Sequence, residues 1–144
     1  FDADGQMRPE DIQKIIAPLL TPQKEVCFGS RFMDNTSNIP FLRKNVMRLG
    51  KIFMSIFFKV TTTDPQSGFR AMTKNAAKQI EITQRGMAHC SEILEQVRRK
   101  KMPFTEVPVT ILYTDYSKKH GTNKFAFIAA VQIASKLIWS KLIK

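Results

Sequence analysis

The sequence predicts one α/β domain, and three observations lead to this prediction. Its 144 residues are 43% hydrophobic and 24% charged, which is the balance of an ordinary globular domain. Short apolar runs typical of buried strands alternate with segments of helical periodicity, in the order strand, helix, strand. No internal repeat, low-complexity tract or linker divides residues 1–144. We therefore expect helices and strands that share a single domain.

The first part of the chain predicts a strand end, a helix and a second strand. Residues 1–6 look like the end of a buried strand that enters a loop, so we expect the chain to be a piece of a longer protein. Residues 8–20 predict an amphipathic helix with Pro9 in its first turn. Residues 25–29 form a short apolar run before a loop over residues 30–40, and predict a buried strand. The apolar positions of the helix are Ile12, Ile15, Ile16, Leu19 and Leu20.

A long helix is predicted over residues 41–60, with an apolar side and a basic side. The apolar side, which we expect to face the core, carries Val46, Leu49, Phe53, Phe57 and Val60. The basic side carries Lys44, Arg48, Lys51 and Lys59. The remaining apolar residues Ile52, Met54 and Phe58 would lie sideways, next to the basic residues. This is how a helix presents itself to anionic lipid, so we expect the basic residues to face a membrane.

The later elements are shorter. Residues 61–68 predict a loop, and residues 69–72 predict a short strand before a helix near Ala76. Ser91 is expected to cap the next helix, whose inward residues we expect to be Ile93, Leu94 and Val97. The apolar period of Phe104 to Tyr113 predicts a strand, and two prolines favour an edge position or an irregular stretch. A basic loop and a terminal amphipathic helix are expected over residues 115–124 and 124–144.

The charge and cysteine content limit the class of protein. Lys and Arg number 23 against 12 Asp and Glu, so the net charge is +11, which favours phosphate-bearing partners or an anionic membrane surface. Cys27 and Cys90 fit no metal-ligand spacing and are too few to stabilise a secreted fold, so we expect a reducing compartment. No apolar run reaches the ~18 residues of a membrane-spanning helix. We therefore expect no span of the bilayer.

Asp2 and Asp4 are a candidate metal site. Two carboxylates separated by one residue at a strand end can converge on one hard cation, and Gln6 adds a neutral oxygen nearby. Mg²⁺ or Mn²⁺ keeps positions open for phosphate oxygens, so the pair suits a nucleotide diphosphate whose leaving group needs its charge neutralised. The alternative for the pair taken alone is a solvated turn, because Asp and Gly are common turn residues.

Five short motifs occur in one order along the chain. They are Asp2-Ala3-Asp4-Gly5-Gln6, Pro9-Glu10-Asp11-Ile12, Gly29-Ser30-Arg31, Asp64-Pro65-Gln66-Ser67-Gly68-Phe69-Arg70-Ala71 and Glu106-Val107-Pro108-Val109. Together they resemble the family 2 inverting glycosyltransferases, particularly the dolichyl-phosphate mannose synthase-like and polyprenyl-phosphate branch. The resemblance covers residues 1 to about 124. It implies the C-terminal half of a GT-A fold, a mixed sheet flanked by helices, with the N-terminal nucleotide-binding half outside this chain.

The resemblance also implies roles for individual residues. Asp2 and Asp4 would hold a divalent metal, Mg²⁺ or Mn²⁺, and the donor diphosphate, with Gln6 as a further metal ligand. Lys124 would contact the donor pyrophosphate. Asp64 would act as catalytic base or as an orienter of the acceptor, the alternative being a loop opener. The acceptor phosphate would be bound by Arg31, Ser67 and Arg70. Each arginine taken alone also fits a surface ion pair.

Three functions follow as hypotheses. The first is metal-dependent, inverting transfer of a sugar from a nucleotide-sugar to a polyprenyl phosphate, by a cytoplasmic enzyme peripheral to the inner face of the membrane. The second is transfer to a glycan hydroxyl, which would need a base. The third, of another class, is a basic nucleic-acid-binding module, which only the net charge and scattered aromatic residues favour. The ordered motifs argue against the third, and we expect no nucleic-acid partner, an inactive isolated chain and a homo-oligomer.

Overall fold

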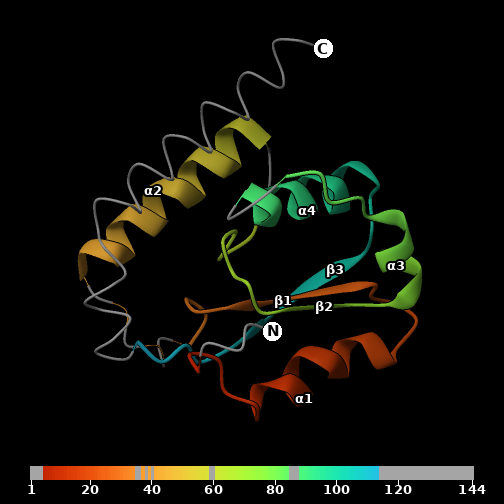
Figure 1. Cartoon of the computed structure of the whole chain (residues 1–144), viewed down its shortest axis with the longest axis horizontal. Coiled ribbons are helices and arrows are strands. Elements are labelled where there is room, and N and C mark those ends of the chain that lie inside the picture. The colour runs from red at the N-terminus through yellow and green to blue at the C-terminus, as the bar shows by residue number, and fades with distance from the viewer. Residues whose placement is uncertain are drawn as a thin grey trace.

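A computed structural model describes residues 5–34, 37, 39, 41–58, 61–84 and 88–113 (Figure 1). Several predictions fall outside this part of the chain: those on Asp2, Asp4, Lys59 and Lys124, and the terminal helix over residues 124–144. The described residues form a three-stranded sheet with helices on both faces. The α/β prediction is therefore confirmed.

The sheet is mixed, as expected for part of a GT-A fold. Its strand order is β2-β1-β3, with β1 (Val26–Ser30) in the centre. β1 runs antiparallel to β2 (Arg70–Met72) and parallel to β3 (Phe104–Pro108). β3 is an outer strand of this sheet, as its prolines predict, but it is shorter than expected. The last hydrogen bond of the ladder runs from the Val109 N–H to the Ser30 carbonyl at 3.0 Å, and further along the described chain an isolated bridge joins Met7 and Ile111.

Alternate residues of β1 build two cores, one on each face of the sheet. Val26 and Phe28 pack on the face covered by α3 and α4, where the Phe28 ring meets Phe104 edge to face at 5.9 Å between centroids. Cys27 lies on the opposite face, which α1 covers. This alternation is the period of two that a strand buried on both faces requires. The first cluster is Val26, Phe28, Ala76, Ile93, Leu94, Val97 and Met102, and the second is Ile15, Cys27, Phe69 and Val109.

The helix expected over residues 8–20 is shorter and changes type. α1 spans Asp11–Ile16 and continues as the 3-10 helix η1 over Ala17–Leu20. Pro18 lies at the start of η1 and has no N–H for the α-helical hydrogen bond, so the tighter helix replaces the α-helix there. Ile15 is buried, but Leu20 is 79% exposed. The end of the predicted apolar stripe therefore does not reach the core.

The long helix is present as predicted. α2 spans Phe41–Phe58, and residues 59–60 lie outside the described residues. The inward prediction is wrong for Leu49, which is 65% exposed. Arg48 and Lys51 are exposed and Lys44 is half-buried, in keeping with a basic outer side. The predictions for four other side chains of α2 lie outside the described part of the structure: Phe53, Met54, Phe57 and Phe58.

The two remaining helices cover one face of the sheet. α3 (Lys74–Gln79) is capped by Thr73, whose hydroxyl accepts a hydrogen bond from the Ala76 N–H. α4 spans Ala88–Arg99, so Ser91 lies inside the helix and the prediction that it caps the helix is wrong. The three apolar residues predicted to face inward are all buried: Ile93, Leu94 and Val97. The inward face of α4 is therefore confirmed.

Candidate functional site

Polar side chains from three segments meet where β1 and β3 end. Parallel strands finish at the same edge of a sheet, so β1 delivers Ser30 and the following Arg31 next to the end of β3. The loop before β2 brings Thr63 and Asp64 to the same edge. We call these residues the Arg31–Asp64 cluster: Ser30, Arg31, Thr63, Asp64, Glu106 and Tyr113.

A bidentate ion pair forms the centre of the cluster. Arg31 Nε lies 2.5 Å from Asp64 Oδ2 and Arg31 Nη2 lies 2.6 Å from Asp64 Oδ1. The Arg31 backbone N–H donates to the same carboxylate, and Nη1 donates to the Tyr113 hydroxyl at 3.3 Å. Burial by itself lowers the pKa of the Arg31 guanidinium, but the hydrogen bond and charge of Asp64 outweigh it and raise that pKa. The Arg31 guanidinium is therefore held in its charged form.

Glu106 of β3 supports the loop that carries Asp64. Its carboxylate accepts hydrogen bonds from the Thr63 N–H at 2.9 Å, the Thr63 hydroxyl at 2.9 Å and the Asp64 N–H at 3.4 Å. The Thr63 hydroxyl also lies 2.6 Å from Ser30 Oγ, which in turn accepts from the Phe32 N–H. Backbone and side chains thus link the ends of β1 and β3 to the Asp64 loop.

The rest of this loop lies against α4. The Ser67 hydroxyl accepts from the Phe69 N–H, and Arg70 Nη2 donates to the Ser67 carbonyl at 3.1 Å. Arg70 Nη2 also lies 2.8 Å from Cys90 Sγ, and Gln66 Nε2 donates to Ser91 Oγ. The structure therefore brings Arg31 together with Asp64, whereas Ser67 and Arg70 form a second group beside α4. Phosphate binding by these residues stays a prediction.

Gly29, the first residue of the Gly29-Ser30-Arg31 motif, allows two segments to approach β1 closely. A Cβ at this position would lie 2.8 Å from both methyl groups of Val109 and 3.1 Å from the Phe69 carbonyl oxygen. The Gly29 N–H donates to that oxygen at 2.7 Å. The glycine thus permits the packing that holds Ser30 and Arg31 at the end of the strand.

The end of the predicted metal loop is attached to the segment after β3. The Gln6 carbonyl accepts from the Leu112 N–H, next to the bridge between Met7 and Ile111. Asp11 is buried and its Oδ2 accepts from the Thr110 N–H at 2.8 Å. Within residues 5–113, as far as they are described, no three His, Cys, Asp or Glu side chains gather as a metal site. The proposed donor set of two carboxylates and one amide oxygen fits Mg²⁺ or Mn²⁺ by its chemistry.

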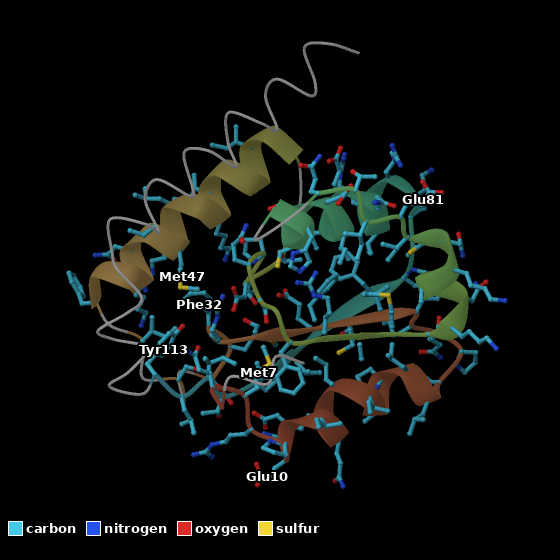
Figure 2. All side chains as sticks on the ribbon, in the orientation of Figure 1. Met7, Glu10, Phe32, Met47, Glu81 and Tyr113 are labelled. Carbon is cyan, nitrogen blue, oxygen red and sulfur yellow. The ribbon has the colours of Figure 1, made fainter. Side chains whose placement is uncertain are left out.

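Sequence reasoning did not single out Glu106, Thr63 or Tyr113 as site residues. Glu106 occurs in the last of the five motifs, and its signal is that it is the one charged residue of a strand with several apolar neighbours. Figure 2 shows Tyr113, Phe32 and Met47 of α2 on the side of the molecule where β1 ends, with Glu81 at the opposite side. Tyr113 of the cluster therefore lies on the same side of the molecule as Met47 of α2.

The exposed surface of α2 combines apolar and basic residues. Phe41, Leu49, Ile52 and Ile56 are all more than half exposed, and their spacing places them within one quarter of the helix circumference. Lys44, Arg48 and Lys51 follow on the adjoining side of the helix. In the described part of the chain, no helix has the length and apolar character to cross a membrane.

Comparison with known proteins identifies related sequences. No family model matches the chain, and no solved structure matches it. It is 40% identical over 128 residues, 85% of its length, to a UDP-N-acetylglucosamine–dolichyl-phosphate N-acetylglucosaminyltransferase of Methanococcus voltae. It is 34% identical over 99% of its length to an uncharacterised protein of Methanocaldococcus jannaschii. Over 89% of its length it is 30% identical to a dolichol-phosphate mannosyltransferase of Pyrococcus furiosus.

The chain covers only part of these relatives. It spans 51%, 59% and 37% of their respective lengths. Both relatives with a named activity are sugar transferases that share the dolichyl-phosphate part of their names and differ in the sugar. The match includes most of the chain and agrees with the resemblance seen in the ordered motifs and with the mixed α/β sheet. On this evidence the chain is similar, over most of its length, to part of the polyprenyl-phosphate glycosyltransferases.

Proposed function

We propose that the protein transfers a sugar from a nucleotide-sugar to a polyprenyl phosphate, with inversion and with a divalent metal. The observation that carries this proposal is the likeness to two relatives with different sugars and the same class of acceptor. The region that this chain shares with both relatives would then bind what the two reactions have in common, namely the acceptor. The proposal leaves the sugar and the nucleotide open.

The Arg31–Asp64 cluster supports a phosphate acceptor over a hydroxyl acceptor. A phosphate monoester has a second pKa near ~6, so it is largely ionised at neutral pH and attacks without losing a proton to a base. Both oxygens of Asp64 already accept hydrogen bonds from Arg31, which suits a carboxylate that orients a guanidinium better than one that takes a proton. We therefore assign Asp64 to positioning Arg31 and Arg31 to the acceptor phosphate.

The donor side of the proposal rests on residues near the chain start and on Lys124. Asp2, Asp4 and Gln6 would hold Mg²⁺ or Mn²⁺, and Lys124 would contact the pyrophosphate. The metal would neutralise charge that develops on the leaving diphosphate. Asp4→Asn should abolish Mn²⁺ binding, because a neutral amide binds a hard cation more weakly than a carboxylate does. Electron paramagnetic resonance of Mn²⁺ measures this binding. Unchanged Mn²⁺ affinity in this variant would remove Asp4 from the site.

The acceptor proposal is tested by kinetics of the complete enzyme with farnesyl phosphate as acceptor. Arg31→Lys should raise the acceptor KM by about tenfold or more and leave the donor KM unchanged, since an ammonium cannot reproduce the bidentate fork. The matched control is Arg98→Lys, at an exposed arginine of α4. Transfer to a glycan hydroxyl with none to farnesyl phosphate would contradict the proposal.

We also propose that α2 binds an anionic bilayer from one side, which would place the enzyme at the inner face of the membrane. The apolar residues Phe41, Leu49, Ile52 and Ile56 would enter the headgroup layer beside Lys44, Arg48 and Lys51. Each basic residue near an anionic surface contributes about 1 kcal/mol. The charge of the adjoining side thus complements the lipid.

Vesicle sedimentation separates this proposal from a merely solvated helix. A triple variant with Lys44, Arg48 and Lys51 changed to Glu should lose binding to phosphatidylglycerol vesicles, and added salt should weaken binding of the wild type. The control variant carries the same charge change at exposed residues of α3 and α4, namely Lys74, Lys78 and Arg98. Equal loss in both variants would show that only net charge matters and would contradict a role of α2.

A further inference from the structure

We propose that Glu106 is a positioning residue that holds Arg31, through the Asp64 loop, in the orientation that receives the acceptor phosphate. The inference rests on the proposed function for the identity of the ligand. It goes beyond that function because it assigns a role to a strand residue that would not touch the substrate. Glu106 would act through a series of hydrogen bonds that runs from β3, through the Asp64 loop, to the Arg31 guanidinium.

The first link is between Glu106 and the loop. One carboxylate oxygen, Oε1, accepts from the Thr63 N–H, the Thr63 hydroxyl and the Asp64 N–H at 2.9, 2.9 and 3.4 Å. Oε2 also accepts from the Thr63 N–H. These donors belong to consecutive residues of a loop without regular structure, so the loop depends on side-chain acceptors for its conformation. Glu106 thereby fixes the backbone from which the Asp64 side chain projects.

The second link is between Asp64 and Arg31. Asp64 is buried, and its two oxygens receive Nε, Nη2 and the backbone N–H of Arg31. A bidentate pair has strict geometry, so a shift of the Asp64 backbone changes the orientation of the guanidinium plane. Nη1, which points to the Tyr113 hydroxyl, moves with that plane. Misplacement by about 1 Å can lower a rate by about 100-fold.

Register explains why Glu106 occupies the right place. It pairs with Phe28 in the parallel ladder, and two residues later the same ladder pairs Ser30 with Pro108. The Glu106 side chain therefore lies on the same face as Ser30. Thr63 Oγ1 is within hydrogen-bond distance of both the Ser30 hydroxyl and the Glu106 carboxylate. A carboxylate one residue earlier or later in β3 would project to the opposite face.

The orientation of Arg31 is directly measurable by ¹⁵N NMR of its side chain in the full chain. A guanidinium Nε–H bonded to a buried carboxylate gives a shifted resonance that exchanges slowly with water, and Arg31→Lys identifies it by its disappearance. Glu106→Ala should move this resonance toward the position of an exposed arginine and accelerate its exchange at least tenfold. Glu106→Gln should retain most of the wild-type signal, because its carbonyl oxygen can replace Oε1.

Two further variants test whether misfolding or the loss of any glutamate could explain the result. Thr63→Val removes the hydroxyl shared by Glu106 and Ser30, keeps the side-chain shape, and should produce a smaller change in the same direction. If Glu106→Ala does not fold, Thr63→Val and Glu106→Gln decide the question. Glu95→Ala, at a glutamate of α4, is the matched control and should leave the Arg31 resonance unchanged. An unchanged resonance in both Glu106→Ala and Thr63→Val would overturn the inference.

Titration with farnesyl phosphate, followed at the same resonance, distinguishes the inference from the proposed function. Wild type should respond to the ligand, and Glu106→Ala should bind it about tenfold or more weakly. Release of Arg31 in Glu106→Ala without any response of wild type to farnesyl phosphate would contradict the acceptor and leave the positioning role intact. Binding of farnesyl phosphate by wild type with an Arg31 signal indifferent to Glu106 would contradict the positioning role alone.

Discussion

The buried ion pair between Arg31 and Asp64 has consequences for stability at the residue scale. Removing one partner leaves an uncompensated buried charge, so Asp64→Ala should lower the free energy of unfolding by about 3 to 5 kcal/mol. The double variant Arg31→Met, Asp64→Leu should lose less than Asp64→Ala, because no charge remains buried. Urea denaturation measures both. A loss of only ~1 kcal/mol in Asp64→Ala would instead indicate an exposed pair.

Cys27 provides a second prediction at this scale. Burial, with a smaller effect from the charge of Glu106, raises the pKa of the Cys27 thiol to about 11. The reactive thiolate is therefore scarce in the folded chain at pH 8. We expect slow alkylation of Cys27 by iodoacetamide in the native protein and rapid alkylation in urea, followed by mass spectrometry of the Cys27 peptide. Equal rates in the two conditions would contradict the burial of this strand position.

At the scale of the element, β1 depends on the close contact at Gly29. Gly29→Ala should destabilise the protein by about 1 to 3 kcal/mol, because the new methyl group would overlap both methyl groups of Val109. Val109→Ala removes those groups, so the double variant should lose less than the sum of the two single variants. Thermal unfolding of the four proteins gives this comparison. Strict additivity would show that the strain arises elsewhere.

Glu92 joins α4 to the segment before it and predicts a pH dependence. Burial alone raises the pKa of the Glu92 carboxyl, but hydrogen bonds from the Thr83 hydroxyl and the Gln84 and Thr83 N–H groups together lower it below its ordinary 4.5. The ionised form therefore stabilises the fold above pH 4.5, and this stabilisation is lost as the pH falls through the folded-state value.

The test is urea unfolding of wild type and Glu92→Gln between pH 7 and 3. Wild type should be the more stable protein at pH 7, and the difference between the two should shrink as the pH falls below 4.5. Glu81→Gln, at an exposed glutamate, is the control and should track wild type throughout. A difference that is constant with pH would show that Glu92 acts through packing alone.

At the scale of the whole molecule, the net charge of +11 predicts attraction to any polyanion. Binding to anionic vesicles should differ from binding to duplex DNA, because only the vesicle accepts apolar side chains. Ile52→Ser with Ile56→Ser should weaken vesicle binding and leave the salt-dependent retention on DNA unchanged. Equal weakening on both would favour the nucleic-acid hypothesis. Homo-oligomer formation stays a prediction, which light scattering can check.

The sequence by itself determined the elements whose signal is local. The apolar run of β1 and the inward residues of α4 reproduce the structure because each element's burial pattern is a repeat along the chain, and α2 spans nearly the predicted range. The ordered motifs likewise indicated the related enzymes before any comparison. Local patterns were misleading at Pro18, where a missing backbone N–H ends the α-helix, and at Ser91, where the helix begins three residues earlier at Ala88.

Only the tertiary structure decided which site residues meet. Arg31 and Asp64 are 33 positions apart, and Thr63 and Glu106 are 43 apart, so no periodic pattern relates them. Sequence reasoning assigned Arg31 to phosphate and, separately, Asp64 to a role as catalytic base or orienter of the acceptor, and did not select Glu106 as a site residue. The parallel register of β1 and β3 sets Phe28 opposite Glu106 and brings the strand ends together. A side chain's partner is thus fixed by the pairing of distant strands, which local sequence does not encode.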